Sequence, residues 1–230
     1  MITQAIILAG GLGTRLQKIV SDLPKPMADI NGTPFLQYIF NYLKKYNIKK
    51  VILSVGYKHE KIIEYFGNKY NNITIEYAIE SDPLGTGGAI KFAINKINQD
   101  NFFLINGDTF FDVNLKKISD FYFKNNADIL LSLKPLTNFD RYGAVEIDND
   151  YNIIKFNEKK YQKQGLINGG VYIINKKIFD KTNKTKFSFE KDIMEKYLNN
   201  IKMIGFISDT YFIDIGIPED YKKAQTDLKL

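Results

Sequence analysis

The stretch Leu8-Ala9-Gly10-Gly11-Leu12-Gly13-Thr14-Arg15-Leu16 follows an apolar run, residues 5–8, that is typical of a buried β-strand. The three glycines that follow the run let the backbone turn sharply and let a ligand approach bare N–H groups. Consecutive N–H groups in such a turn form a concave anion site, to which Arg15 adds a planar donor fork suited to phosphate. The stretch therefore predicts a strand followed by a loop that holds a polyphosphate.

Two well-known phosphate loops do not fit this stretch. A P-loop needs a lysine and a hydroxyl residue directly after its last glycine, and they are not in those places here. A dinucleotide fingerprint needs a third glycine where Leu16 stands, and an acidic residue where Gly56-Tyr57 follow the second predicted strand. The pattern therefore disfavours NAD binding.

The rest of the chain alternates strands and helices and then turns antiparallel. Apolar patterns predict strands at residues 2–8, 50–55, 73–79, 102–105 and 127–133, and helices at 33–46, 59–66, from the 80–88 loop to about 97, and at 115–123. From Gly143 on, they predict strands at 144–147, 153–156, 166–174, 203–207 and 211–215, with helices beginning at Ser188 and at Pro218. This order predicts an α/β fold, a single Rossmann-like doubly wound domain over residues 1–230 with an inserted antiparallel part.

Composition places the chain among ordinary globular proteins. Hydrophobic residues make up 44%, charged residues 25%, and there is no cysteine. The net charge of +6 comes from scattered lysines without a basic stripe, so we expect no nucleic-acid partner. We also expect no signal peptide, no membrane span and a cytoplasmic location. The oligomeric state stays open, and a homo-oligomer is compatible with the sequence.

Four charged residues stand out in the sequence. Lys25 lies in Leu23-Pro24-Lys25-Pro26-Met27, and the prolines predict a stiff loop that presents the lysine in a fixed direction. Asp108 comes just past a buried strand, where open α/β sheets bind ligands. Arg15 and Arg141 are the two arginines of a chain that otherwise uses lysine. His59 is the single histidine, and its charged neighbours predict a surface helix position rather than a catalytic base.

Gly10-Gly11-Leu12-Gly13-Thr14-Arg15 followed by Pro24-Lys25-Pro26 resembles the signature of the sugar-1-phosphate nucleotidyltransferases. The resemblance runs the length of the chain. It continues in Glu80 with Leu84-Gly85-Thr86-Gly87-Gly88, Asn106-Gly107-Asp108, Tyr142-Gly143, Phe156-Asn157-Glu158-Lys159, Asn168-Gly169-Gly170-Val171-Tyr172 and Phe212-Ile213-Asp214-Ile215-Gly216. It implies a GT-A-like mixed sheet, with a nucleotide-binding part at about residues 1–135 and a small antiparallel sugar-phosphate-binding part at about 136–215.

The resemblance also implies roles for individual residues. The catalytic residues would be Arg15, Lys25 and Asp108, and Asp108 and Asp214 would hold Mg²⁺. Nucleotide binding would fall to Leu8, Ala9, Gly10, Gly11, Gly13, Thr14, Arg15, Lys25, Glu80, Leu84, Gly85, Thr86, Gly88, Asn106, Gly107 and Asp108. Sugar-phosphate binding would fall to Tyr142, Gly143, Glu158, Lys159, Asn168, Gly169 and Gly170.

Elementary chemistry agrees with these roles. In such a reaction a sugar 1-phosphate oxygen attacks the α-phosphorus of a nucleoside triphosphate and pyrophosphate leaves. The nucleophile is already an anion, so no activated serine or cysteine is needed, and catalysis depends on positioning and charge neutralisation. Mg²⁺ prefers carboxylate and phosphate oxygens, which Asp108, Asp214 and the substrates would supply.

Within the family, three stretches look most like the D-glycero-α-D-manno-heptose 1-phosphate guanylyltransferases, which make GDP-heptose for bacterial surface polysaccharide. They are Asp29-Ile30-Asn31-Gly32, Phe139-Asp140-Arg141-Tyr142-Gly143 and Gln164-Gly165-Leu166-Ile167-Asn168-Gly169-Gly170. We therefore expect GTP and a heptose 1-phosphate as substrates. A pairing of UTP, CTP or dTTP with a hexose 1-phosphate, or of GTP with mannose 1-phosphate, stays open because pocket shape decides it.

Two alternatives come from other functional classes. A non-catalytic nucleotide-sugar sensor on the same fold would be expected to lack one of Arg15, Lys25, Asp108 or Asp214, and all four are present. A glycosyltransferase would use the D-x-D string Asp148-Asn149-Asp150, but this string falls between two short predicted strands, where a hairpin turn explains it.

Overall fold

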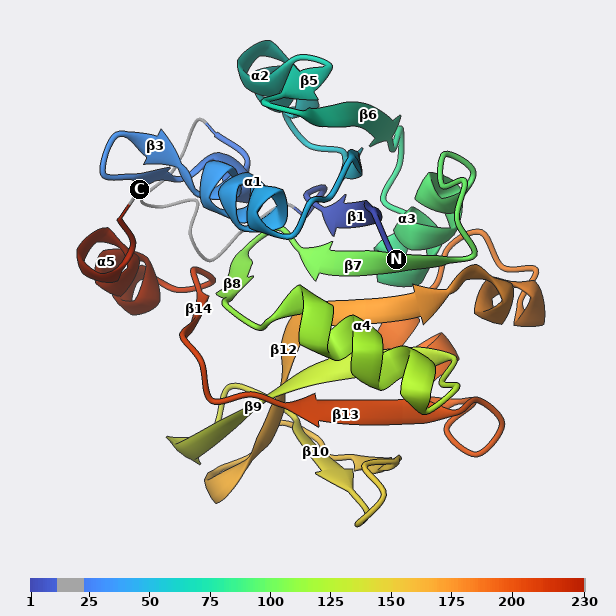
Figure 1. The fold of residues 1–230 in the computed structure, drawn as a ribbon. Coiled ribbons are helices and arrows are strands. Elements are labelled where there is room, and N and C mark those ends of the chain that lie inside the picture. The colour runs from blue at the N-terminus through green and yellow to red at the C-terminus, as the bar shows by residue number, and fades with distance from the viewer. Residues whose placement is uncertain (12–22, 230) are drawn as a thin grey trace.

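Strand β1 (Gln4–Leu8) lies inside the sheet, between β4 (Lys50–Val55) and β7 (Asn101–Asn106), and pairs parallel with both (Figure 1). In register, Ile6 of β1 faces Ile52 on one side and Leu104 on the other. The computed structural model describes residues 1–11 and 23–229. The apolar run before the glycine loop is thus the buried parallel strand that it predicts.

The strand order creates a crevice beside β1. Beyond β4 lie β6 (Ile73–Ile79), which is parallel to it, and β5 (Lys69–Tyr70), so the chain first winds away from β1 in one direction. It then returns through α3 (Gly85–Ile94) to place β7 on the other side of β1. Such a reversal leaves room at the carboxyl ends of β1 and β7, which is where doubly wound sheets bind ligands.

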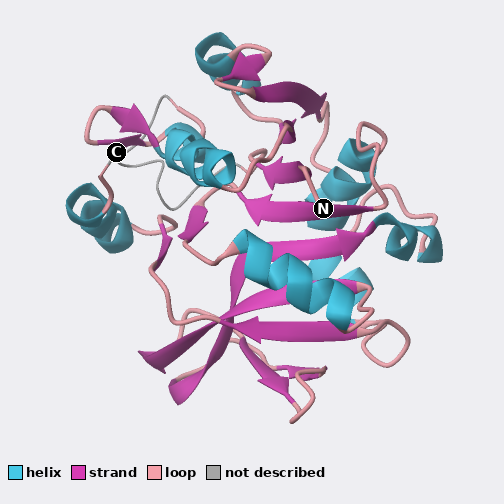
Figure 2. Ribbon diagram, viewed as in Figure 1, coloured by secondary structure: helices cyan, strands magenta, loops and turns pink. Residues whose placement is uncertain are grey.

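Alternate side chains of the central strands serve two separate cores. Ala5 and Ile7 of β1 pack in one apolar cluster with helices α1 (Phe35–Lys45), α2 (His59–Phe66) and α4 (Leu115–Lys124). Ile6 packs in a second cluster that includes Ile90 and Ala93 of α3. Helices therefore cover both faces, with α1 and α4 in front of the sheet in this view (Figure 2).

The long strand β12 (Gln162–Asn175) joins the parallel half of the sheet to the antiparallel half. Its second part pairs antiparallel with β7, and it pairs along most of its length with β9 (Ile129–Phe139). It also pairs with β10 (Ala144–Ile147), which carries β11 (Ile153–Phe156), and β13 (Met203–Ile207) extends the sheet beyond β9. Ten strands of the described residues thus form one mixed sheet, which confirms the predicted fold class.

Most elements keep their predicted bounds to within two residues, and four differ. The strand predicted at residues 127–133 is β9, which continues to Phe139. Gly85, Gly87 and Gly88, predicted in a loop, lie in the first turn of α3. Residues 162–165 extend β12 ahead of its predicted start because they pair with residues 136–139 of β9. The helix expected from Ser188 is a π-helical segment, η3 (Glu190–Glu195).

The remaining elements lie around this framework. They are η1 (Lys25–Met27), β2 (Asp29–Ile30), β3 (Thr33–Pro34), β8 (Thr109–Phe111), η2 (Lys176–Lys181), β14 (Phe212–Asp214) and α5 (Pro218–Asp227). No helix in the described part of the chain is long and apolar enough to cross a membrane.

Candidate active site

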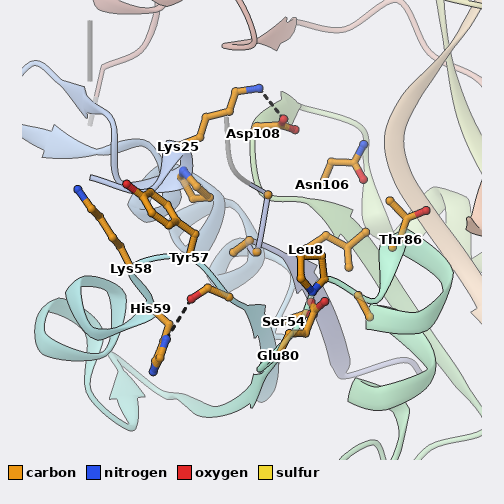
Figure 3. A pocket seen from close by; sticks show the side chains of 18 of the residues that line it. Leu8, Lys25, Ser54, Tyr57, Lys58, His59, Glu80, Thr86, Asn106 and Asp108 are labelled. Atoms are coloured by element: carbon orange, nitrogen blue, oxygen red, sulfur yellow. Dashed lines mark hydrogen bonds and ion pairs between the residues drawn. The ribbon is translucent and has the colours of Figure 1, made fainter. Parts of the chain in front are cut away.

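A cavity of about 960 Å³ opens at the carboxyl ends of β1, β4 and β7 (Figure 3). Residues 8–11 line it directly after β1, and Asn106 and Asp108 line it at the end of β7. This is the crevice that the strand order predicts. Ten of the predicted site residues line it: Leu8, Ala9, Gly10, Gly11, Lys25, Glu80, Gly85, Thr86, Asn106 and Asp108.

One lysine and two carboxylates meet at one end of the cavity. The Nζ atom of Lys25 lies 2.6 Å from Oδ2 of Asp108 (Figure 3). It also lies 3.7 Å from Oδ1 of Asp214. The Lys25 side chain is only 12% exposed, and its ammonium group lies next to both carboxylates. The structure therefore unites Lys25, Asp108 and Asp214, which are far apart in the sequence.

A small two-stranded ribbon brings the two aspartates together. In it β14 pairs antiparallel with β8, so that Asp214 stands opposite Thr109, the residue after Asp108. The backbone N–H of Ile215 donates to the Asp108 carbonyl at 3.0 Å, which closes the pair. Gly216 leaves the space that Lys25 needs, because a Cβ there would lie 2.8 Å from Asp214 Oδ1 and 3.2 Å from Lys25 Nζ.

The carboxylates fit a divalent cation. Burial raises the pKa of Asp214, and the nearby charge of Asp108 raises it further, while Lys25 opposes the shift. Two oxygens of this kind, gathered around one positive charge, are hard donors that suit a small divalent ion. No group of three or more His, Cys, Asp or Glu side chains gathers in the described ranges, so substrate oxygens or water would complete the coordination.

Glu80 is fixed at the wall beside the glycine loop. Its Oε1 accepts a hydrogen bond from Ser54 Oγ at 3.1 Å, and its Oε2 accepts one from the backbone N–H of Leu84 at 3.0 Å. A Cβ at Gly10 would lie 3.2 Å from Glu80 Oε1, so the glycine lets the loop pass close to this carboxylate. Glu80 and Gly10 thus face the same part of the cavity.

The residues of the stretch Leu84-Gly85-Thr86-Gly87-Gly88 line two different cavities. Gly85 and Thr86 line the first, whereas Leu84 and Gly88 line a second cavity of about 730 Å³. Gly88 packs closely against the segment that precedes η3, since a Cβ there would lie 2.2 Å from the Thr185 carbonyl oxygen. The two residues support the site from behind the first turn of α3.

Gly88→Ala should therefore destabilise the fold. A helical alanine gains roughly 1 kcal/mol over glycine, but forcing a methyl group into a backbone carbonyl typically costs about 1–3 kcal/mol. We expect the melting temperature to fall by a few degrees, measured by thermal unfolding. Gly11→Ala is the control, because a Cβ there meets none of the described residues within 4 Å. An unchanged melting temperature in Gly88→Ala would contradict the close packing.

Two of the residues expected to bind the sugar phosphate, Asn168 and Gly170, lie next to Asn106 at the edge of the cavity. Asn168 donates to the Tyr172 hydroxyl at 2.8 Å, and its Oδ1 accepts from the N–H of Gly170 at 3.1 Å. Gly170 has a φ of +74°, and a Cβ there would lie 2.9 Å from Asn106 Nδ2. Asn168 and Gly170 therefore adjoin the cavity through Asn106.

The other residues expected to bind the sugar phosphate range from closely packed to exposed. A Cβ at Gly169 would lie 2.3 Å from the Phe111 ring, and one at Gly143 would lie 2.6 Å from the Asn157 carbonyl oxygen. Tyr142 accepts a hydrogen bond from Arg141, which also pairs with Asp220 of α5. Burial raises the pKa of Tyr142, and the charge of Asp214 raises it further. The Tyr142 ring packs against Phe212 of β14, the strand that carries Asp214. Glu158 and Lys159 are exposed.

Some predicted residues lie outside the described part of the chain. Gly13, Thr14 and Arg15 belong to residues 12–22, which the structure does not describe. Gly107 is described but supports the site from outside the cavity lining. Its N–H donates to the Leu8 carbonyl at 2.9 Å, which ties the end of β1 to Asp108.

The cavity also contains residues that the sequence did not single out. Tyr57, Lys58 and His59 line the wall opposite Thr86 and Asn106 (Figure 3). Glu190 also lines the cavity, next to Thr86. Residues 57–59 follow the parallel strand β4, and this position alone could have predicted that they lie near the cavity. His59 begins α2 as predicted, with Nδ1 3.0 Å from the Gly56 carbonyl oxygen.

Comparison with known proteins shows extensive similarity. The nucleotidyl transferase family model matches residues 4–229. A D-glycero-α-D-manno-heptose 1-phosphate guanylyltransferase of Aneurinibacillus thermoaerophilus is 56% identical over 227 residues, 98% of each chain. The protein of the same name from Campylobacter jejuni is 53% identical over 219 residues, 95% of this chain and 96% of the relative.

Solved structures agree with the fold. HddC from Yersinia pseudotuberculosis, complexed with GMP-PN, has a TM-score of 0.90 at 41% identity, over 99% of this chain and 100% of its own. A putative glucose-1-phosphate thymidylyltransferase from Bacillus anthracis has a TM-score of 0.86 at 20% identity, over 99% of this chain and 96% of its own. This second similarity concerns the fold alone.

Proposed function

The chain belongs to the nucleotidyl transferase family, and we propose that it transfers the guanylyl group of GTP to D-glycero-α-D-manno-heptose 1-phosphate, releasing pyrophosphate and forming GDP-heptose. The family transfers nucleotidyl groups to sugar 1-phosphates. Two relatives more than 50% identical over at least 95% of this chain carry the name of this activity. The observation that carries the chemistry is the cluster of Lys25, Asp108 and Asp214 in the cavity.

Asp108 and Asp214 would hold the metal ion in this proposal. The family typically uses a divalent metal, and we propose that it is Mg²⁺ here, because the donors are carboxylate oxygens. Bound there, the ion would neutralise phosphate charge and help to orient the triphosphate. Lys25 pairs with Asp108 and Asp214 in the structure, so its ammonium group would turn to the α-phosphate when the carboxylates take up the metal.

The chain's own groups would then position both substrates. The N–H groups of residues 10–11, together with Arg15, would hold the triphosphate, while Glu80 would face the base and ribose. The sugar phosphate oxygen attacks as an anion, so the residues need only align it and shield its charge. Lys159 would hold this phosphate, and Glu158, Tyr142, Gly143 and residues 168–170 would contact the sugar.

The nucleotide-binding part would span about residues 1–135 and the sugar-phosphate-binding part about 136–215. Strand β12, which carries Asn168 of the second part, pairs with β7 of the first part, so the two parts would share one sheet. We further propose that the enzyme works in the cytoplasm, where GTP is available, and that it needs no nucleic acid or membrane. A homo-oligomer remains compatible with the proposal.

A substrate matrix tests the proposal. GTP, CTP, UTP, ATP and dTTP are each combined with a panel of sugar 1-phosphates and Mg²⁺, and pyrophosphate release is followed. We expect GTP with D-glycero-α-D-manno-heptose 1-phosphate to give the highest kcat/KM. If UTP or CTP with a hexose 1-phosphate gives the highest value, the proposed base and sugar are wrong. If no pair releases pyrophosphate, the proposed reaction is wrong.

A further inference from the structure

Glu190 places in the cavity a carboxylate that the proposed mechanism does not use. Its Oε2 accepts hydrogen bonds from Thr86 Oγ1 at 2.6 Å and from Ser188 Oγ at 2.7 Å. Its Oε1 accepts none from the described residues. One oxygen is therefore fixed by two hydroxyl groups, while the other keeps its capacity to accept a hydrogen bond from a ligand.

Glu190 is not needed to cap either neighbouring helix. The backbone N–H groups of Gly87 and Gly88, in the first turn of α3, donate to the Phe187 carbonyl. At the start of η3, the N–H of Lys191 donates to Ser188 Oγ, and Asp192 accepts from the N–H of Ser188. These backbone donors are thus served by other groups, and the Glu190 carboxylate itself accepts only from the hydroxyl groups of Thr86 and Ser188 among the described residues.

The charge of Glu190 restricts what it can bind. Within the described ranges, 1–11 and 23–229, it forms no ion pair with a lysine, an arginine or the histidine. A carboxylate without a cation repels phosphate oxygens, so it is misplaced for holding a triphosphate. It is well suited to accept from a hydroxyl group, and such hydrogen bonds to an ionised acceptor are the strong ones.

Contacts place Glu190 next to Asn168, which we propose contacts the sugar. Phe189, the residue before Glu190, packs its ring against Tyr172 of β12 with 5.9 Å between the ring centroids. Burial raises the pKa of Tyr172, and the charge of Glu190 raises it further. Tyr172 in turn accepts from Asn168, which adjoins Asn106 through Gly170. Thr86 and Asn106 stand on one side of the cavity, away from Tyr57, Lys58 and His59 (Figure 3). Glu80 with Ser54 occupies the part next to Gly10.

We propose that Glu190 is a specificity-determining residue that accepts a hydrogen bond from a hydroxyl group of the sugar 1-phosphate, with Thr86 and Ser188 holding its carboxylate in place. This inference rests on the proposed function, since it names a group that selects the second substrate. A site that pairs a fixed acceptor with one hydroxyl discriminates against sugars that lack it, because the acceptor oxygen then loses that partner.

The first test compares Glu190→Gln with the matched control Glu195→Gln. Glu195 ends the same π-helical segment but is exposed and does not line the cavity. For Glu190→Gln we expect KM for the sugar 1-phosphate to rise about tenfold or more, with KM for GTP and the melting temperature unchanged. Glu195→Gln should match the wild type in all three. A rise in KM for GTP, or equal changes in both KM values, would overturn the proposal.

The second test uses monodeoxy analogues of the accepted sugar 1-phosphate. For the analogue that lacks the hydroxyl bound by Glu190, the wild type and Glu190→Gln should have the same kcat/KM, because the lost contact is the same. For the other analogues the difference between the two proteins should persist. If it persists for every analogue, the inference is wrong. If the wild type itself releases no pyrophosphate with GTP and any sugar 1-phosphate, the proposed function fails instead.

Discussion

Asp108→Asn should lower kcat about a thousandfold, which corresponds to about 4 kcal/mol of transition-state stabilisation. The substitution removes the negative charge that we propose binds the metal, but keeps an oxygen that can accept from Lys25 or from Thr109 Oγ1. Because the Asp108 side chain is 38% exposed, little folding energy depends on its charge. The measurement is pyrophosphate release at saturating GTP, sugar 1-phosphate and Mg²⁺, together with thermal unfolding.

Asp112→Asn provides the matched control for this prediction. Asp112 is exposed, lies directly after β8 and four residues after Asp108, and does not line the cavity. The same chemical change there should leave kcat at the wild-type value. A kcat for Asp108→Asn within threefold of wild type would remove Asp108 from the proposed catalytic group.

Lys25→Met should lower kcat by at least a hundredfold and, in the absence of nucleotide, strengthen metal binding. The first effect follows because a cation next to the reacting phosphate stabilises the charge that develops there. The second follows because the Lys25 ammonium group lies 2.6 Å from Asp108 and 3.7 Å from Asp214, where it competes with a divalent ion. Kinetics give the first effect, and calorimetric titration of the nucleotide-free protein with Mg²⁺ gives the second.

Lys134→Met separates these effects from the general cost of losing a half-buried lysine. Lys134 is 14% exposed, close to the 12% of Lys25, and it also pairs with an aspartate, Asp209, at 2.5 Å. It does not line the cavity, so its loss should leave kcat and metal affinity unchanged. If Lys25→Met weakens metal binding, Lys25 does not compete for the carboxylates, and the proposed exchange between lysine and metal is wrong.

Sequence patterns predict several strands of the sheet well because the burial of these strands is regular. The bounds of β4 (Lys50–Val55), β6 (Ile73–Ile79) and β13 (Met203–Ile207) are as expected, since continuous or alternating apolar residues reflect burial on one or both faces. The first turn of α3 was misjudged, because glycine is a poor helix former. Tertiary packing overrides this preference: a Cβ at Gly87 would lie 2.2 Å from the Phe187 ring.

The candidate site was predictable where its residues lie in compact motifs. The stiff proline loop presents Lys25, and Asp108 follows its strand directly, so local sequence suffices to nominate them. Glu190 could not be found in this way, because its partner Thr86 is 104 residues away and its own neighbours predict only a helix start. The pairing of Glu190 with Thr86 can be recognised only in the folded structure, where these distant segments pack together.

The place of β12 also bears on how the polypeptide is made. Residues 101–106 of β7 leave the ribosome well before residues 162–175 of β12. The edge of β7 that pairs with β12 therefore has no neighbouring strand during that interval. An open, apolar strand edge is a template for wrong pairing with other chains. We therefore expect the nascent chain to be open to such pairing until β12 covers this edge of β7.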